Sequence, residues 1–111
     1  MSDTKTLYAE AEQLKEDGKF DEAIAKLNEL LTADESHVLS HLTLAVVYGK
    51  VGQHSEAVKH AQRACELEPN EPFNFTAASV CFQRAYAGTG DQSYIQKAED
   101  AMAQAHMLQG R

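Results

Sequence analysis

Residues 18–24 read Gly-Lys-Phe-Asp-Glu-Ala-Ile, and residues 52–58 repeat the pattern as Gly-Gln-His-Ser-Glu-Ala-Val. The glycine, the glutamate and the alanine each recur after 34 residues. The pair Ala11 and Ala45 falls into the same register. A period of 34 residues is too long for a coiled-coil heptad and fits one helix–turn–helix unit. We therefore expect the chain to be built from repeated helix pairs.

Apolar residues recur three and four positions apart along the chain, which is the spacing of amphipathic helices. Six such segments can be distinguished, and none shows the sustained alternation of a β-strand. Pro69 blocks continuation of the fourth helix, and Pro72 suits the first turn of the fifth. The candidate caps are Ser2, Asp3 or Thr4 for the first helix, Ser55 for the fourth, and Asp91 or Ser93 for the sixth.

These repeats resemble the tetratricopeptide repeat (TPR) family. The second repeat, 38–71, carries the pattern most completely, through Leu44, Ala45, Tyr48, Gly52, Ala57, Ala64 and Pro69. The first repeat is 4–37, and the third is 72–108 with about seven extra residues, which we expect to form a loop near 87–93. His41 and Ala61 replace residues that are commonly aromatic in the family, and Glu35 stands where proline is usual.

The resemblance implies an all-α fold in a single TPR domain, 1–111. We expect a right-handed TPR superhelix, an α-α solenoid, of three antiparallel helix pairs with six helices. One helix pair cannot bury its apolar face alone, so the pairs stack to form a shared core, and three repeats are about the minimum for stability.

Charge limits the classes of partner. The chain has 17 acidic and 10 basic residues, and residues 1–36 alone carry ten acids against four bases. This acidity argues against nucleic-acid binding, which needs a basic surface. No apolar run is long enough to span a membrane, and the first residues lack a signal-peptide pattern, so we expect a cytoplasmic protein. Cys65 and Cys81 are interpreted as small hydrophobic residues in a reducing compartment.

The TPR resemblance also implies a function in protein–protein interaction, as a small adaptor or scaffold. In the family, the first helices of successive repeats line a concave groove that binds a partner peptide or helix. By position, the groove would contain Tyr8, Glu12, Leu39, Leu42, Val46, Lys50, Phe73, Thr76, Val80, Gln83 and Arg84. The groove is largely apolar, although Leu39, Leu42 and Phe73 can alternatively be covered by neighbouring helices.

Two features of this groove concern charge. Some family members clamp a C-terminal carboxylate with Lys, Asn and Arg, but the corresponding positions here are Tyr8, Glu12, Val46, Thr76 and Val80. We therefore do not expect that mode of binding. Lys50 and Arg84 share one repeat position, and they would either hold a partner carboxylate together at the rim or be two separate solvated cations.

A second hypothesis is self-assembly into a homo-oligomer. Only residues 109–111 follow the sixth predicted helix, so an apolar face of that helix is expected to be partly exposed. The residues of this face are Tyr94, Ile95, Met102, Met107 and Leu108. The alternative is that the methionines fill the last layer of the core.

An alternative function of another class is metal binding. His37 and His41 are four residues apart, which places them on one helix face, with Asp34 and Glu35 nearby. A metal-binding regulatory protein is thus an alternative, although a helix start and core packing also explain the two histidines. The sequence has no phosphate loop, nucleophile elbow or zinc-binding His-Glu pair. We predict neither an enzyme nor a cofactor.

Overall fold

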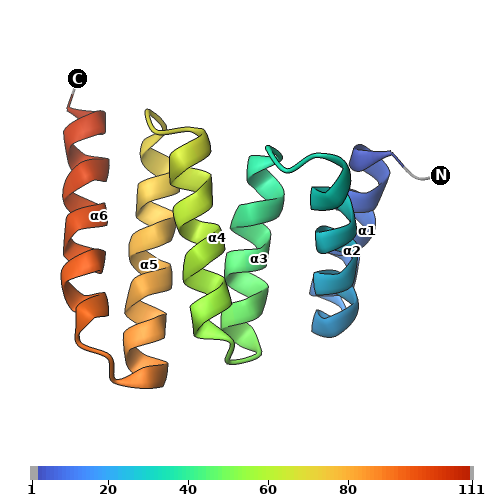
Figure 1. Ribbon diagram of the computed structural model, residues 1–111, viewed down its shortest axis with the longest axis horizontal. Helices are drawn as coiled ribbons and strands as arrows, with labels where there is room; N and C mark the ends of the chain where they lie inside the picture. Colours follow the sequence, from blue (N-terminus) through green and yellow to red (C-terminus); the bar gives the residue numbers. More distant parts are fainter. Residues whose placement is uncertain (1–2, 111) are drawn as a thin grey trace.

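The computed structural model describes residues 3–110, which form six α-helices and no β-strand. The helices are α1 (Thr4–Glu16), α2 (Phe20–Ala33), α3 (Val38–Lys50), α4 (His54–Leu67), α5 (Pro72–Thr89) and α6 (Ser93–Gln109). Successive helices alternate in direction along a row (Figure 1). The predicted helical-repeat solenoid is therefore confirmed, with three antiparallel pairs: α1 with α2, α3 with α4, and α5 with α6.

The repeated glycines make the turns within the first two pairs. Gly18 has a φ of 76° and Gly52 a φ of 81°. This left-handed backbone region is open to glycine but strained for residues with a Cβ atom. The chain therefore turns directly from α1 into α2, and from α3 into α4, which explains why glycine recurs at this position.

The helix starts agree only in part with the predicted caps. The Asp3 carboxylate accepts a hydrogen bond from the Thr6 backbone N–H at 2.8 Å, as predicted, while Ser2 lies outside the described residues. Ser55 does not cap α4, because the helix begins at His54 directly after the tight turn at Gly52, with Gln53 in the cap position. Asp91 accepts from the backbone N–H of Ser93 at 3.0 Å and so marks the start of α6.

The predicted loop near 87–93 is largely helical, which corrects the expectation from sequence. α5 continues to Thr89, and only residues 90–92 connect it to α6. Gly88 explains the difference, because a Cβ atom there would lie 2.2 Å from Nε2 of His54. Glycine thus lets the extended end of α5 pass close to the start of α4. The helix then ends at Gly90, whose φ is 74°.

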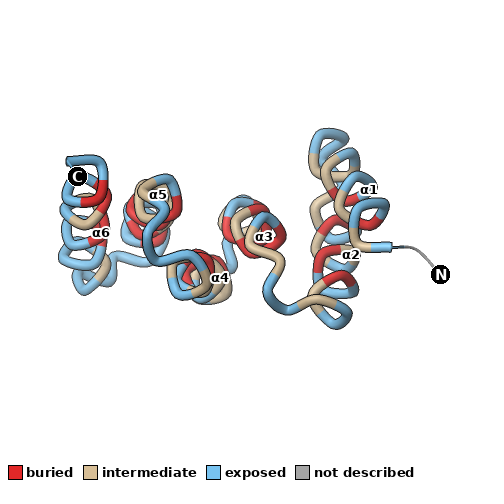
Figure 2. The backbone as a smooth tube through the Cα atoms, turned by 90° about the horizontal axis from the view of Figure 1, so that it is seen from above, coloured by how far each residue is buried: buried red, intermediate tan, exposed pale blue. Residues whose placement is uncertain are grey.

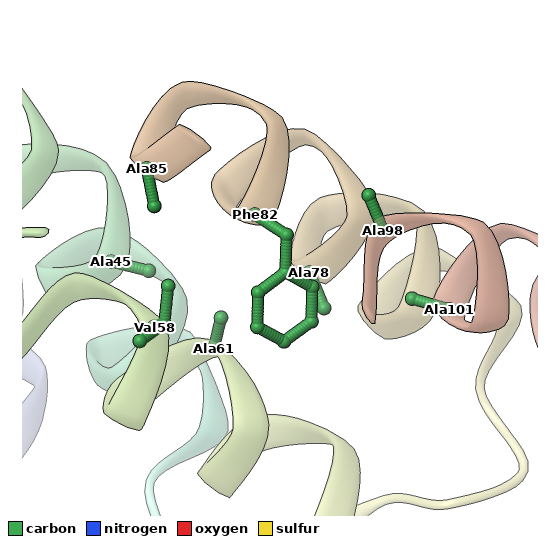
Figure 3. Packing of buried hydrophobic residues seen from close by; sticks show 8 residues of the cluster. All are labelled: Ala45, Val58, Ala61, Ala78, Phe82, Ala85, Ala98 and Ala101. Carbon is green, nitrogen blue, oxygen red and sulfur yellow. The ribbon is translucent and has the colours of Figure 1, made fainter. Parts of the chain in front are cut away.

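The core consists of two clusters of buried apolar side chains. The larger one spans α3 to α6 and surrounds the ring of Phe82 with alanines and Val58 (Figure 3). The smaller one joins Ala11, Leu27 and Leu44, from α1, α2 and α3. Buried residues face neighbouring helices along the row, whereas the outward faces are exposed (Figure 2). The alanine side chains at these contacts are small, so the helix backbones approach closely.

No helix in the described part of the chain is both long enough and apolar enough to cross a membrane.

Candidate functional site

A groove lies between α3 and α5, the first helices of the second and third pairs. These two helices contact each other and run in the same direction, and both begin at the top of the view in Figure 1. The lower part of the groove is a hollow of about 280 Å³, and the upper part is a hollow of about 840 Å³. Leu42 and Phe73 line both hollows, so the two form one continuous surface. We call this surface the α3–α5 groove.

Several of the predicted groove residues do line this surface. The smaller hollow contains Leu42, Val46, Phe73, Thr76, Val80 and Arg84, and the larger one contains Leu39. Leu39 and Phe73 are 55% and 61% exposed, and Val46 and Val80 are 37% and 38% exposed. Neighbouring helices therefore do not cover these four apolar side chains, while Leu42 is half-buried. Exposed apolar side chains gathered in a groove are typical of an interaction surface.

Tyr8 and Glu12 lie elsewhere, in a contact between α1 and α3. The Tyr8 hydroxyl donates to Glu12 Oε1 at 2.7 Å and lies 3.0 Å from Oγ1 of Thr43, which itself lies 3.2 Å from Glu12. Burial alone would raise the pKa of Glu12, but hydrogen bonds from Tyr8 and Lys15 lower it below its usual value. Both predicted residues thus bond to other side chains of the same chain, and neither lines the α3–α5 groove.

The predicted groove residues Lys50, Gln83 and Arg84 lie in three different surroundings. Arg84 lines the smaller hollow of the α3–α5 groove. The Lys50 ammonium lies 5.9 Å from the ring centroid of Phe20, in α2, which is a cation–π geometry. Gln83 donates to the Ser79 hydroxyl at 3.3 Å and lines a different hollow, between α5 and α6. Only Arg84 of these three therefore faces the groove.

The opposite end of the groove carries acidic residues that the sequence analysis missed. Asp34, Glu68 and Glu71 line the larger hollow, beside the loops that lead into α3 and α5. A sequence signal existed, because Asp34 and Glu68 are separated by the same 34 residues as the repeated glycines. Lys50 and Arg84 share that spacing at the other ends of α3 and α5. The repeat register therefore places acids at one end of these helices and bases at the other.

His37 and His41 serve different contacts. Nδ1 of His37 accepts from the Ser40 backbone N–H at 3.3 Å and caps α3. Nε2 of His41 donates to the backbone carbonyl oxygen of Glu35 at 2.8 Å, and its Nδ1 lies 2.9 Å from Nδ1 of His60. Among residues 3–110, no three His, Cys, Asp or Glu side chains are grouped as metal ligands. The two histidines predicted as a metal pair thus have structural partners instead.

Two departures from the TPR pattern, Glu35 and His41, contact each other. The Glu35 carboxylate also accepts two hydrogen bonds from the Arg63 guanidinium, at 2.7 and 2.8 Å. Hydrogen bonds from Arg63 lower the pKa of Glu35 to about 2. Burial lowers the pKa of His60, whose ring stacks on Tyr48. We call Glu35, His41, His60 and Arg63 the histidine network; it fastens the connection between α2 and α3 onto α4.

The two cysteines are poorly suited to nucleophilic chemistry. Cys65 and Cys81 are free thiols, and each is half-buried. Burial raises the pKa of both thiols to about 11, so the reactive thiolate is scarce near neutral pH.

The predicted self-association residues do not form one exposed face. Leu108 is 8% exposed and belongs to the core, which corrects the expectation that it lies on the surface. The Tyr94 ring stacks on Phe82 with 6.1 Å between centroids. Tyr94, Ile95 and Met102 line a hollow of about 340 Å³ between α5 and α6, while Met107 is exposed outside it. We call this hollow the α5–α6 hollow.

Neither a protein-family model nor a curated protein sequence matches the chain. Solved structures do resemble its fold. The type III secretion translocator chaperone SycD of Yersinia enterocolitica superimposes with a TM-score of 0.79 at 20% identity, over 95% of this chain and 74% of SycD. The second TPR domain of Spaghetti (RPAP3), bound to an HSP90 peptide, has a TM-score of 0.78 at 19% identity, over 96% of this chain and 93% of that chain.

A third structure, PcrH in complex with the chaperone binding region of PopD, gives a TM-score of 0.64 at 20% identity. This match covers 96% of the present chain and 91% of PcrH. At such identities the likeness establishes the fold and leaves the partner open. The six helices, the 34-residue register and these superpositions together show that the chain is a three-repeat protein with the tetratricopeptide repeat fold.

Proposed function

We propose that the chain is a protein-interaction module that binds an apolar segment of a partner protein in the α3–α5 groove. The observation that carries this proposal is the group of four exposed apolar side chains, Leu39, Val46, Phe73 and Val80, on one continuous surface. A partner segment would remove these side chains from water, which is the main driving force of association. The helix pairs hold the groove ready-made, so little ordering is needed on binding.

The solved structures support this proposal. RPAP3 was solved with an HSP90 peptide, and PcrH with a region of PopD, so two proteins of this fold bind peptide segments. The present chain differs from carboxylate-clamping TPR domains, because Tyr8 and Glu12 are bonded to Thr43. We therefore propose contact with apolar side chains in place of the capture of a chain terminus. The proposed role is non-catalytic.

Selection from a library of random displayed peptides, about twelve residues long, tests this function. We expect peptides that bind the purified protein and lose binding to the Val46→Glu variant, because a carboxylate would then sit in the apolar surface. Ile95→Glu is the matched control, since Ile95 is 40% exposed and Val46 37%, and Ile95 lies on α6. The control should retain binding.

Circular dichroism and thermal unfolding of both variants establish that they fold. The proposal fails if the selection yields no binder, or if every binder tolerates Val46→Glu and loses affinity to Ile95→Glu.

A second candidate function is self-assembly through the α5–α6 hollow. The observation that favours it is the exposed Ile95 beside Tyr94 and Met102 in that hollow. SycD, a protein of this fold, was solved as a dimer. Light scattering over a range of concentrations would show a mass above the 12.2 kDa chain mass, and Ile95→Glu would return it to the monomer value. A monomer at every concentration removes this candidate.

A further inference from the structure

We infer that the segment bound in the α3–α5 groove has an apolar centre, a basic residue at one end and an acidic residue at the other. Its basic end lies beside the loops that precede α3 and α5, and its acidic end lies beside Arg84. This inference rests on the proposed function and adds to it the charge pattern and orientation of the partner segment.

The upper end of the groove is negatively charged. Asp34, Glu68 and Glu71 line the larger hollow there. Within residues 3–110, none of these three carboxylates forms an ion pair. The N-terminal ends of α3 and α5 oppose this charge with roughly half a positive charge each, which is less than the charge of three carboxylates. The end as a whole therefore favours a cation.

The lower end of the groove is positively charged. Arg84 lines the smaller hollow, is exposed, and forms no ion pair with any residue between 3 and 110. Lys50 adds a second positive charge at the end of α3, although its ammonium lies over Phe20. The guanidinium can donate two parallel hydrogen bonds to a carboxylate, so Arg84 is the group expected to contact an acidic partner residue.

The apolar stretch between these ends sets the spacing of the partner's charges. On α5, Phe73 lies near the upper end of the groove and Arg84 at its lower end, eleven residues apart. At 1.5 Å per residue this separation is about 16 Å. An extended partner spans that distance with about five residues, and a helical partner with about eleven.

Opposite charges at the two ends also fix the orientation. A segment placed the other way round would bring its acid to Asp34, Glu68 and Glu71 and its base to Arg84. Like charges in contact disfavour that arrangement, so the groove distinguishes the two directions of an otherwise apolar segment.

The test uses peptides from the random library that bind in a manner dependent on Val46. We expect these peptides to share an apolar centre flanked by a base and an acid at one of the two predicted spacings. Arg84→Glu should weaken their binding about two- to fivefold, the range expected for an exposed charge pair. Peptides in which the acid is replaced by lysine should then bind Arg84→Glu better than the original peptides do.

Lys19→Glu is the matched control, because it makes the same charge change on a residue that lines neither hollow. It should leave affinity unchanged at about 0.15 M salt, where a charge outside the groove is largely screened. The effect of Arg84→Glu should also shrink at about 0.5 M salt, where surface charges are screened.

Four results would overturn the inference. The charge pattern would be contradicted by Val46-dependent peptides that have no charges or like charges at both ends. It would also be contradicted by equal effects of Arg84→Glu and Lys19→Glu. Both results would leave the proposed function intact. Absence of any Val46-dependent peptide would remove both. A protein that dimerises alone, and becomes monomeric on Val46→Glu, would show that a second copy occupies the groove.

Discussion

The two joints between helix pairs are held together by different kinds of contact. Between the second and third pairs, Phe82 and a group of alanines form an apolar core, and the buried Asn74 amide donates to the backbone carbonyls of Ala64 and Glu68. Between the first and second pairs, the small cluster of Leu27 and Leu44 is supplemented by titratable side chains. We call the contact between the second and third pairs the apolar joint, and its stability should fall when side-chain volume is removed. We call the contact between the first and second pairs the polar joint, and its stability should depend on its hydroxyl groups and on pH.

The side chains at the polar joint come from three helices and one loop. The Tyr8 hydroxyl contacts Thr43 and Glu12, and the histidine network fastens the α2–α3 connection to α4. The Tyr8 hydroxyl and the His41–His60 pair need their partners, because a buried or half-buried polar atom that loses its hydrogen bond is costly, whereas the Glu35–Arg63 pair is exposed to solvent. The α3–α5 groove lies mainly on the other joint, but Asp34 of the α2–α3 connection lines its upper end, so the polar joint adjoins that end of the binding surface.

The largest expected effect is at the apolar joint, from Phe82→Ala. Phe82 is 5% exposed, and its removal should lower the free energy of unfolding by about 3–5 kcal/mol. That loss is a large part of the total stability of a small domain, so Phe82→Leu, expected to cost less than about 1.5 kcal/mol, provides a variant that stays folded. Urea unfolding measures both. A loss below about 1 kcal/mol for Phe82→Ala would show that this ring does not hold the joint together.

A smaller effect is expected at the polar joint from Tyr8→Phe. The change removes the hydroxyl that contacts Glu12 and Thr43 and keeps the ring, so the free energy of unfolding should fall by about 0.5–1.5 kcal/mol. The pKa of Glu12 should rise, since Tyr8 is one of the donors that lower it. Carbon-13 NMR titration of the carboxyl group measures this shift. Tyr86→Phe is the control, because Tyr86 is exposed and its hydroxyl has no hydrogen-bond partner within the described chain. Equal losses in both variants would contradict the role of the Tyr8 hydroxyl.

The sequence was sufficient for the repeat fold but not for contacts between distant residues. The recurrence of Gly18 at Gly52 reflects a local backbone requirement, and such requirements can be read from one segment. Residues 87–89 are helical instead because Gly88 can lie close to His54, which is 34 residues earlier in the chain. The local sequence Gly-Thr-Gly predicts a loop and does not indicate this contact with a distant residue.

The same distinction applies to the candidate site. The apolar groove residues follow from the position of α3 and α5 in the repeat, so the register was enough to find Val46 and Val80. Tyr8 and Glu12 occupy positions in the first repeat that are equivalent to those of the groove residues. They contact Thr43 in the next pair, however, and no local sequence pattern reveals this contact. The acids Asp34 and Glu68 could have been predicted from the sequence, because they are separated by the 34-residue repeat spacing.

The smallest expected effect is a loss of stability of the polar joint as the pH falls from about 7.5 to about 5.5, the range in which histidines titrate. Burial lowers the pKa of His60 below its ordinary 6.5, while Glu56 opposes this shift and both His41 and Lys59 reinforce it. In this range the unfolded chain binds a proton at His60 more readily than the folded chain does. The contribution of His60 to stability is therefore complete above pH 6.5 and declines as the pH falls below that value.

His60→Gln should reduce that decline, and His106→Gln, on α6, should leave it unchanged. The Glu35 carboxylate does not interfere, because its pKa falls from an ordinary 4.5 to about 2, and its contribution is lost only below this range. Thermal unfolding of the three proteins at both pH values measures the effect. Phe82→Leu should show the full wild-type decline, since the cluster around that ring contains no histidine. If His60→Gln declines as steeply as the wild type, the pH sensitivity does not arise at His60, and the contrast between the two joints would then rest on the hydroxyl of Tyr8.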